Sequence, residues 1–183
     1  MRALVPFPAD FRLVTQTQER RNDQLVTIFR FQADGVYQYN GPRIIGVFYR
    51  ERLLSLKNLT HVPQAAHLSQ TQARTQATQV MTTVDAAYAR GLNFMRIESQ
   101  RRDFITAAGQ SVAFPVYWVK FGHQNGSYNW VTLGLDGTLV EMECESRWDY
   151  FGGRRATEMW DNDDWVLARN GAGPQLDPPN ARA

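Results

Sequence analysis

Alternation of apolar and polar positions is clearest in residues 114–146. Two runs rich in β-branched and aromatic side chains, Val116–Phe121 and Tyr128–Leu135, are each followed by a turn, Asn125-Gly126 or Asp136-Gly137. Asn-Gly and Asp-Gly favour tight hairpins because both central residues of a type I′ turn need a positive φ. The pattern predicts a meander of three antiparallel strands, around which we expect the rest of the chain to be organised.

The last strand of this predicted meander has two different faces. Its residues, in order, are Val140, Glu141, Met142, Glu143, Cys144 and Glu145. Successive side chains of a strand point to opposite sides, so three apolar groups share one face and three carboxylates share the other. We expect the acidic face to be solvated. A register shift of one residue would bury three carboxylates, so the strand pairing is well specified.

Further apolar runs predict a second meander within residues 1–60. These runs are Phe11–Gln18, Leu25–Phe31, Arg43–Tyr49 and Leu53–Lys57, separated by polar or glycine-containing turns. The two meanders resemble each other: Thr27–Phe31 matches Tyr117–Phe121, and Gly46–Leu56 matches Thr132–Met142. Either the two halves are an internal repeat, or any two antiparallel meanders look alike at this level.

A helix is predicted between the two meanders, over residues 69–90. Its apolar residues recur at spacings of three and four and are Ala73, Ala77, Val80, Met81, Val84, Ala87 and Tyr88. Ser69 with Gln72 forms a capping box at the start, and Gly91 stands where helices commonly end. Such a helix would be ~30 Å long. Its alanine-rich stripe would let it lie close against a sheet.

Together these elements predict an α+β fold, in which an antiparallel β-sheet of tandem β-meanders packs on one long amphipathic helix. We expect residues 1–60 to form the N-terminal meander. Residues 61–168 should form one compact unit from the helix, the C-terminal meander and an aromatic segment. Residues 169–183 contain prolines, glycines and few large apolar side chains, so we expect a flexible tail.

Composition and charge exclude several classes of site. The single cysteine excludes an internal disulfide and a cysteine-cluster metal site. The net charge of +2 is too weak to indicate nucleic acid or a membrane as a partner. No apolar run has the length of a signal sequence or a membrane helix, so we expect a cytoplasmic protein. Without a glycine-rich phosphate loop or metal-ligand spacing, no cofactor is expected.

Two groups of carboxylates are candidates for chemistry. Asp161–Asp164 offer oxygens that hard cations prefer, but the glycine and glutamate of a calcium-binding EF-hand loop are absent. A solvated loop or helix start is favoured there, with Arg154 and Arg155 as alternative ionic partners. Glutamates 141, 143 and 145 could act as acid and base on a glycoside, or could pair with cations of an adjacent strand. Cys144 is expected to be buried rather than nucleophilic.

Aromatic residues are concentrated in the C-terminal half, where all five tryptophans lie between residues 118 and 165. Two interpretations are open: they pack the sheet and hold the C-terminal segment over it, or they line a groove for a partner. The residues predicted to bind are Tyr128, Trp130, Trp148, Tyr150, Arg154, Arg155, Trp160 and Trp165. Arginines among aromatics also suit single-stranded nucleic acid, but the neighbouring aspartates argue against that partner.

A helix followed by three strands, with the turn and exit Asp136-Gly137-Thr138-Leu139-Val140, resembles the PepSY-type repeat. The resemblance covers Ser69–Ser146, and residues 11–58 would be a second copy without its leading helix. It implies a domain without catalytic residues that modulates proteases or binds ligands. Members of that family are mostly extracytoplasmic, and the missing leader departs from this pattern.

We therefore expect a non-enzymatic module that binds or regulates a protein or peptide. One alternative is a small hydrolase that uses Glu143 or Asp163, and another is a structural or oligomerisation domain. The sequence indicates no oligomeric state. A monomer without an exposed apolar patch would exclude the last alternative.

Overall fold

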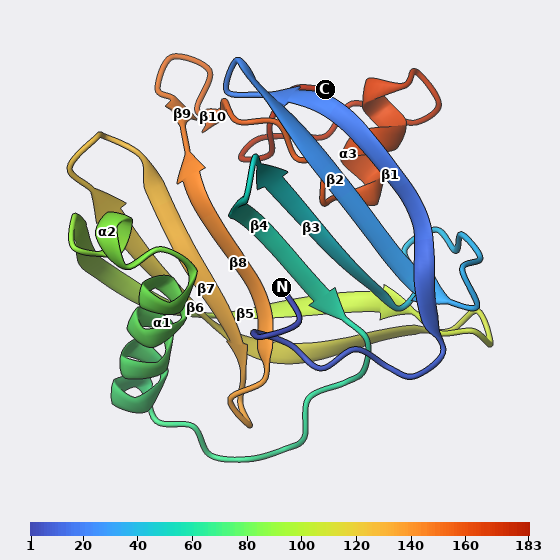
Figure 1. The fold of residues 1–183 in the computed structure, drawn as a ribbon, viewed down its shortest axis with the longest axis horizontal. Coiled ribbons are helices and arrows are strands. Elements are labelled where there is room, and N and C mark those ends of the chain that lie inside the picture. The colour runs from blue at the N-terminus through green and yellow to red at the C-terminus, as the bar shows by residue number, and fades with distance from the viewer.

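One eight-stranded antiparallel sheet forms the centre of the molecule in the computed structural model, which describes residues 1–183 (Figure 1). From edge to edge its strands are β1 (Phe11–Arg21), β2 (Gln24–Ala33), β3 (Arg43–Tyr49), β4 (Arg52–Leu59), β8 (Leu139–Ser146), β7 (Tyr128–Gly134), β6 (Ser111–His123) and β5 (Leu92–Ile105). Two four-stranded meanders therefore join where β4 pairs with β8. Counted inward from either edge, the four strands of each meander follow one another in chain order. An internal repeat nevertheless stays a prediction.

Residues with left-handed backbone close most of the hairpins. Asn22 and Asp23, between β1 and β2, have φ values of 49° and 67°. Gly126 and Gly137 have φ values of 83° and 86°, which glycine adopts without steric cost. The three strands predicted around these two glycines are confirmed as β6, β7 and β8.

The helical layer differs from the prediction. Instead of one helix over 69–90 there are two short helices, α1 (Gln70–Val84) and α2 (Ala86–Ala89). Asp85 between them has extended backbone, and its carboxylate accepts a hydrogen bond from the N–H of Tyr88. Aspartate side chains compete for backbone donors in this way, which ends one helix and starts the next. The expected sheet packed on one long amphipathic helix is therefore wrong, and the fold is mainly antiparallel sheet.

Both ends predicted for the helix have a structural explanation. The capping box is confirmed, because Ser69 accepts from the N–H of Gln72 while the Gln72 side chain accepts from the N–H of Ser69. Gly91 does not have the positive φ of a helix-ending glycine. A Cβ atom at Gly91 would lie 2.3 Å from Nε2 of His123. The glycine therefore permits the close approach of β6.

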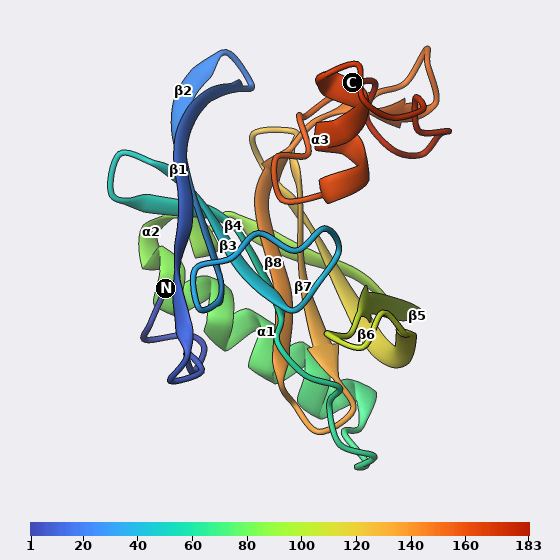
Figure 2. The same ribbon diagram turned by 90° about the vertical axis from the view of Figure 1, so that its right-hand side faces the viewer.

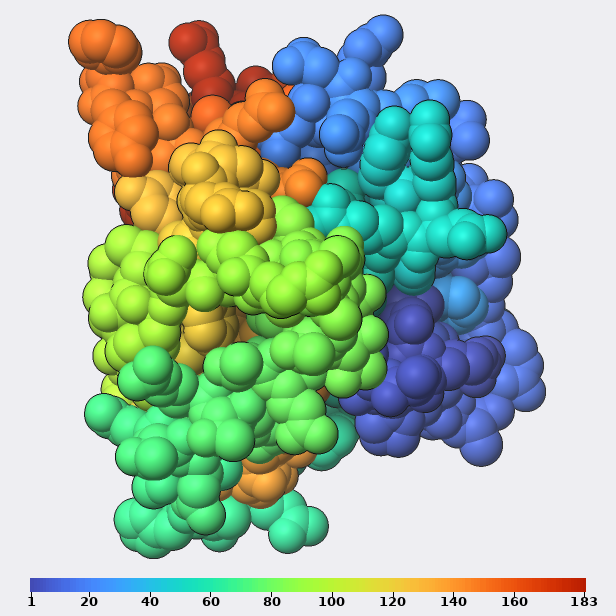
Figure 3. Space-filling model, turned by 60° about the vertical axis from the view of Figure 1, so that its left-hand side comes forward, coloured from blue at the N-terminus to red at the C-terminus, as the bar shows by residue number.

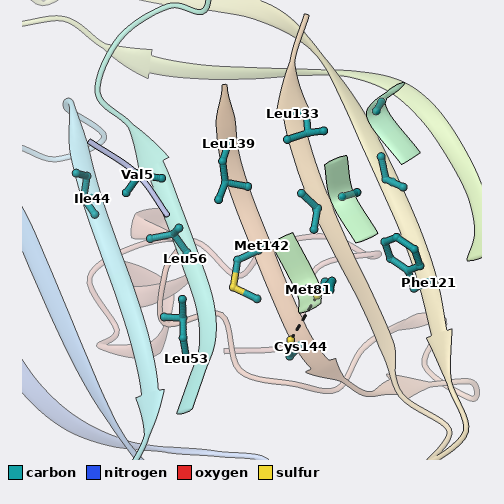
Figure 4. Close-up of a cluster of buried hydrophobic side chains, with 14 of the residues drawn as sticks. Val5, Ile44, Leu53, Leu56, Met81, Phe121, Leu133, Leu139, Met142 and Cys144 are labelled. Atoms are coloured by element: carbon teal, nitrogen blue, oxygen red, sulfur yellow. Dashed lines mark hydrogen bonds between the residues drawn. The ribbon is translucent and has the colours of Figure 1, made fainter. Parts of the chain in front are cut away.

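One face of the sheet carries the main apolar core, which α1, α2 and the N-terminal residues cover (Figures 2, 3 and 4). Leu56, Leu133 and Met142 extend from β4, β7 and β8 into this core (Figure 4). Ala73 and Ala77 are fully buried, so the backbone of α1 lies close to the sheet. Cys144 is 1% exposed, as predicted, and its thiol contacts Met81 Sδ at 3.8 Å.

Residues 147–183, called here the C-terminal segment, lie over the opposite face (Figure 2). The segment contains β9 (Trp148–Asp149), β10 (Arg154–Arg155) and α3 (Asp163–Arg169). The tail predicted to be flexible folds back: Pro179 accepts a hydrogen bond from the N–H of Arg155, and Ala181 is buried. Mobility of the tail stays a prediction. None of the helices has the length and apolar composition needed to cross a membrane.

Candidate functional site

A cleft of about 550 Å³ lies between the sheet and the C-terminal segment. Six neighbouring strands, from β3 to β5, contribute side chains to it, and Trp148, Met159 and Asp161 line it from the C-terminal segment. Because adjacent strands lie about 4.8 Å apart, six strands span roughly 24 Å. The cleft is therefore an elongated groove on the face opposite α1.

The acidic side of β8 faces this groove and is buried rather than solvated. Glu141 and Glu143 are 7% and 1% exposed and both line the cleft. Glu145 has a φ of 58° and pairs instead with Arg52, which also pairs with Asp85 ahead of α2. The expectation of three carboxylates on one solvated face is wrong. The C-terminal segment covers that face, and bulges in the β7–β8 pairing break the alternation.

Two arginines from distant parts of the chain hold Glu143. Its Oε1 atom accepts from Nη2 of Arg21 at 2.7 Å and also from Nη2 of Arg155. Arg21 ends β1, and Arg155 belongs to the C-terminal segment. All three side chains are at most 10% exposed. A buried charge is tolerated only when it is paired and hydrogen-bonded, so this triad couples the segment to the sheet.

A second charged group surrounds Lys57. Its Nζ atom is 3.5 Å from carboxylate oxygens of both Glu141 and Asp161, and Arg102 donates from Nε to Glu141 at 2.8 Å. Burial raises the pKa of Glu141, but Arg102 and Lys57 outweigh it, so the pKa is lowered. The pKa of Asp161 is lowered in the same way, with Lys57 opposing the effect of burial. Both carboxyls are therefore ionised at neutral pH.

In the acidic cluster at 161–164, Asp161 and Asp163 each pair with a cation of the sheet. Both oxygens of Asp163 accept from Arg30, at 2.6 and 2.7 Å. The predicted helix start is confirmed, because Asn162 caps α3 at Asp163. The predicted solvation is wrong for Asp161 and Asp163, which are 8% and 3% exposed. No group of three or more histidine, cysteine or acidic side chains is arranged to hold a metal ion.

Aromatic rings form the other part of the cleft. The ring centroids of Trp118 and Trp130 are 5.7 Å apart with an interplanar angle of 46°. The Lys120 Nζ atom is 3.8 Å from the centroid of Tyr128 and 5.4 Å from that of Trp118. The Arg155 guanidinium lies 5.3 Å from the centroid of Trp130. Cation–π contacts of this kind hold cations beside apolar rings.

The cleft brings together four of the eight residues predicted to bind: Tyr128, Trp130, Trp148 and Arg155. The other four do not line it. Tyr150 is 73% exposed outside the cleft, although its hydroxyl is 2.8 Å from that of Tyr128. Arg154 is half-buried on β10.

Trp160 and Trp165 are packing residues. Nε1 of Trp160 donates to the carbonyl of Arg20, and the ring packs against the small core of β2, β3 and β4. Trp165 is fully buried with Met159 and Ala181. The packing interpretation therefore describes Trp160 and Trp165, whereas Trp118, Trp130 and Trp148 line the cleft.

Sequence reasoning missed several residues of the cleft, namely Lys57, Arg96, Glu98, Arg102, Trp118 and Lys120. The rarity of lysine in this chain sets two of these residues apart. The chain has 20 lysines and arginines, and only Lys57 and Lys120 are lysines. Both line the cleft. No sequence pattern indicated that β5 would bring Arg96 and Arg102 beside them.

No model of a known protein family, no curated protein and no solved structure matches this chain. The resemblance to the PepSY repeat stays a prediction. The geometry of the cleft is therefore the basis for proposing a function.

Proposed function

We propose that this protein is a non-enzymatic binding module that holds a peptide, or a segment of another protein, in the cleft. The single observation that carries the proposal is the groove itself, which crosses six strands and is lined by Trp118, Trp130 and Trp148. A span of roughly 24 Å matches about seven residues of extended chain. Tryptophan, tyrosine and arginine, all present along the groove, are the residue types that most often anchor interfaces.

The ion pairs of the candidate carboxylates favour binding over hydrolysis. Glu143 is held between Arg21 and Arg155, and Asp163 is held by Arg30. Burial raises the pKa of Asp163, but the hydrogen bond from Arg30 and the charge of Arg43 outweigh it, so the pKa is lowered. A general acid needs a raised pKa to hold its proton at neutral pH. These carboxylates are suited to holding the C-terminal segment in place.

Selection from a random heptapeptide library displayed on phage would test this proposal directly. Peptides selected on the wild-type protein would be synthesised with a fluorophore, and their dissociation constants measured by fluorescence anisotropy. We expect Trp130→Ala and Trp148→Ala to weaken binding at least about tenfold, as for anchor residues of interfaces. Circular dichroism would establish that each variant is folded.

The matched control is Phe151→Ala. Phe151 is a fully exposed aromatic of the same C-terminal segment and does not line the cleft. Its removal should leave the dissociation constants unchanged. Failure to select any peptide, or selected peptides that bind both tryptophan variants as tightly as the wild type, would overturn the proposal.

A further inference from the structure

Lys120 differs from every other cation of the cleft. Six cationic side chains line the cleft, and they are Arg43, Lys57, Arg96, Arg102, Lys120 and Arg155. Five of them lie within ion-pair distance of a carboxylate of the chain. Lys120 has no such partner, and its ammonium rests against the rings of Tyr128 and Trp118. Burial and the neighbouring Arg96 lower the pKa of Lys120 and outweigh the opposing charge of Glu98, which forms its ion pair with Arg96 instead.

The carboxylates of the cleft offer little to a cationic ligand. Glu98 accepts from Arg96 and Gln100, while Glu141 and Glu143 are held by the cations described above. Asp161 lies beside Lys57, and Asp164 accepts from the hydroxyl of Tyr39. Asp103 and Asp164 have no ion pair, but Asp164 is partly buried and already accepts hydrogen bonds from Tyr39 and Asn40, whereas Asp103 is exposed. Asp103 is therefore the carboxylate most open to a cation. Asp103 lies seven residues from Arg96 on β5, roughly 23 Å along an extended strand.

The chain's own cations also occupy faces of the aromatic rings. Arg96 lies 5.7 Å from the centroid of Trp118, and Arg155 lies 5.3 Å from that of Trp130. A further cation brought to these rings would be repelled by the cations already beside them. A ligand that carries an anionic group next to an apolar ring would be attracted instead. Its anionic group can pair with the stacked cations, while its ring packs on the indoles.

We infer that the peptide bound in the cleft carries an acidic side chain next to an aromatic or large aliphatic residue. Its carboxylate pairs with Lys120 and Arg96, and its apolar neighbour packs against Trp118 and Trp130. This inference rests on the proposed function and adds the chemistry of the ligand to it. The test is therefore built so that the two can fail separately.

The peptides selected from the heptapeptide library supply the first readout, which is their composition. We expect aspartate or glutamate beside an aromatic or large aliphatic residue to be enriched over the unselected library. The second readout is the dissociation constant of one selected peptide and of its Glu→Gln or Asp→Asn analogue. Loss of the peptide carboxylate should weaken binding to the wild-type protein about tenfold, as for one partner of a partly buried charge pair. This measurement does not depend on the folding of any variant.

Protein variants then identify the cation that pairs with the peptide carboxylate. Lys120→Met should weaken binding of the acidic peptide about tenfold and reduce its sensitivity to the amide substitution, because only Arg96 then remains to pair with the carboxylate, whereas Lys120→Arg should retain most of the affinity. Arg101→Met removes the same charge from an exposed position of β5 outside the cleft and should change little. Two results would overturn the inference alone. One is a selected motif without acidic residues. The other is equal affinity of Lys120→Met and wild type while Trp130→Ala still weakens binding at least about tenfold. Failure to select any peptide would overturn the proposed function as well.

Discussion

The two faces of the same sheet are buried by different means. On one face, α1 and the N-terminal residues cover a continuous apolar core that includes Leu56 and Met142. On the other, the C-terminal segment covers a small apolar core under Trp160 and, beside it, a charged surface in which Lys57, Glu141 and Glu143 are at most 8% exposed. Apolar burial is non-directional, so the first face needs only suitable volume and shape. Charged burial needs a partner for each group, so the second face depends on particular pairs.

This difference explains why the groove lies where it does. Small side chains of α1, such as Ala73 and Ala77, let the first layer close tightly on the sheet. Ion pairs between long side chains fasten the second layer to the sheet, and the cleft lies among these side chains. The residues that fasten the C-terminal segment, Glu143 and Arg155, also line that cleft.

The largest effect should follow from breaking the charged face at its centre. Glu143→Gln removes the charge shared by Arg21 and Arg155, and it leaves two guanidiniums without compensation in a buried site. We expect the free energy of unfolding to fall by about 3–5 kcal/mol. Urea denaturation followed by tryptophan fluorescence measures this change.

The control for this substitution is Glu145→Gln on the same strand. The side chain of Glu145 is 21% exposed and pairs with Arg52, whose side chain is 27% exposed. This pair is more exposed than the pairs of Glu143, and Arg52 keeps Asp85 as a partner, so the loss should be smaller, about 1 kcal/mol. Equal losses for the two variants would show that the charged face is not the more sensitive site, and the contrast between the faces would fail.

A cavity in the apolar core should also lower the free energy of unfolding. Leu56→Ala removes a fully buried side chain from the main core, and we expect a loss of about 2–5 kcal/mol in the free energy of unfolding. Leu25→Ala, at a position 59% exposed on β2, should change it by no more than about 0.5 kcal/mol. High salt should leave the Leu56→Ala effect unchanged, since no charge is involved. A strong dependence on salt would contradict this description of the core.

The smallest expected effect is a loss of stability at acidic pH, which arises when a carboxylate of the charged face is protonated. The pKa of Asp163 is lowered from 3.8 in the folded protein, because Arg30 and Arg43 outweigh burial. The unfolded chain therefore binds this proton more readily than the folded chain. Stability from the pair is complete at neutral pH, begins to fall as the pH approaches 3.8, and is lost as the pH passes the folded value.

Urea midpoints measured from pH 7 to pH 3 test this dependence. Asp163→Asn should be less stable at pH 7 and should show a shallower decline in acid than the wild type. Asp23→Asn, at a side chain 96% exposed, should decline in parallel with the wild type. Parallel decline of Asp163→Asn and the wild type would instead assign the acid sensitivity to other groups.

Prediction from sequence succeeded where the signal was local. The turns at Gly126 and Gly137, the capping box at Ser69 and the burial of Cys144 each depend on residues close in the chain. The long helix failed at Asp85, where a competing cap outweighed the apolar spacing. For the site, four of the eight residues predicted to bind line the cleft. Pairing of Glu141 with a cation of the adjacent strand was one of the predicted alternatives, and Lys57 on β4 is that cation, but the burial of the pair and the pairing of Glu143 with Arg21 and Arg155 were not predicted.

The sequence by itself determined the hairpins and the apolar side of β8, because turn geometry and pleat alternation act between neighbouring residues. Only the tertiary structure decided that β4 lies beside β8 and that Arg21 meets Glu143, which is 122 residues away. The physical reason is that a charge in a sequence specifies its sign but not its partner. Which cation compensates a buried carboxylate is settled only when the C-terminal segment closes over the sheet.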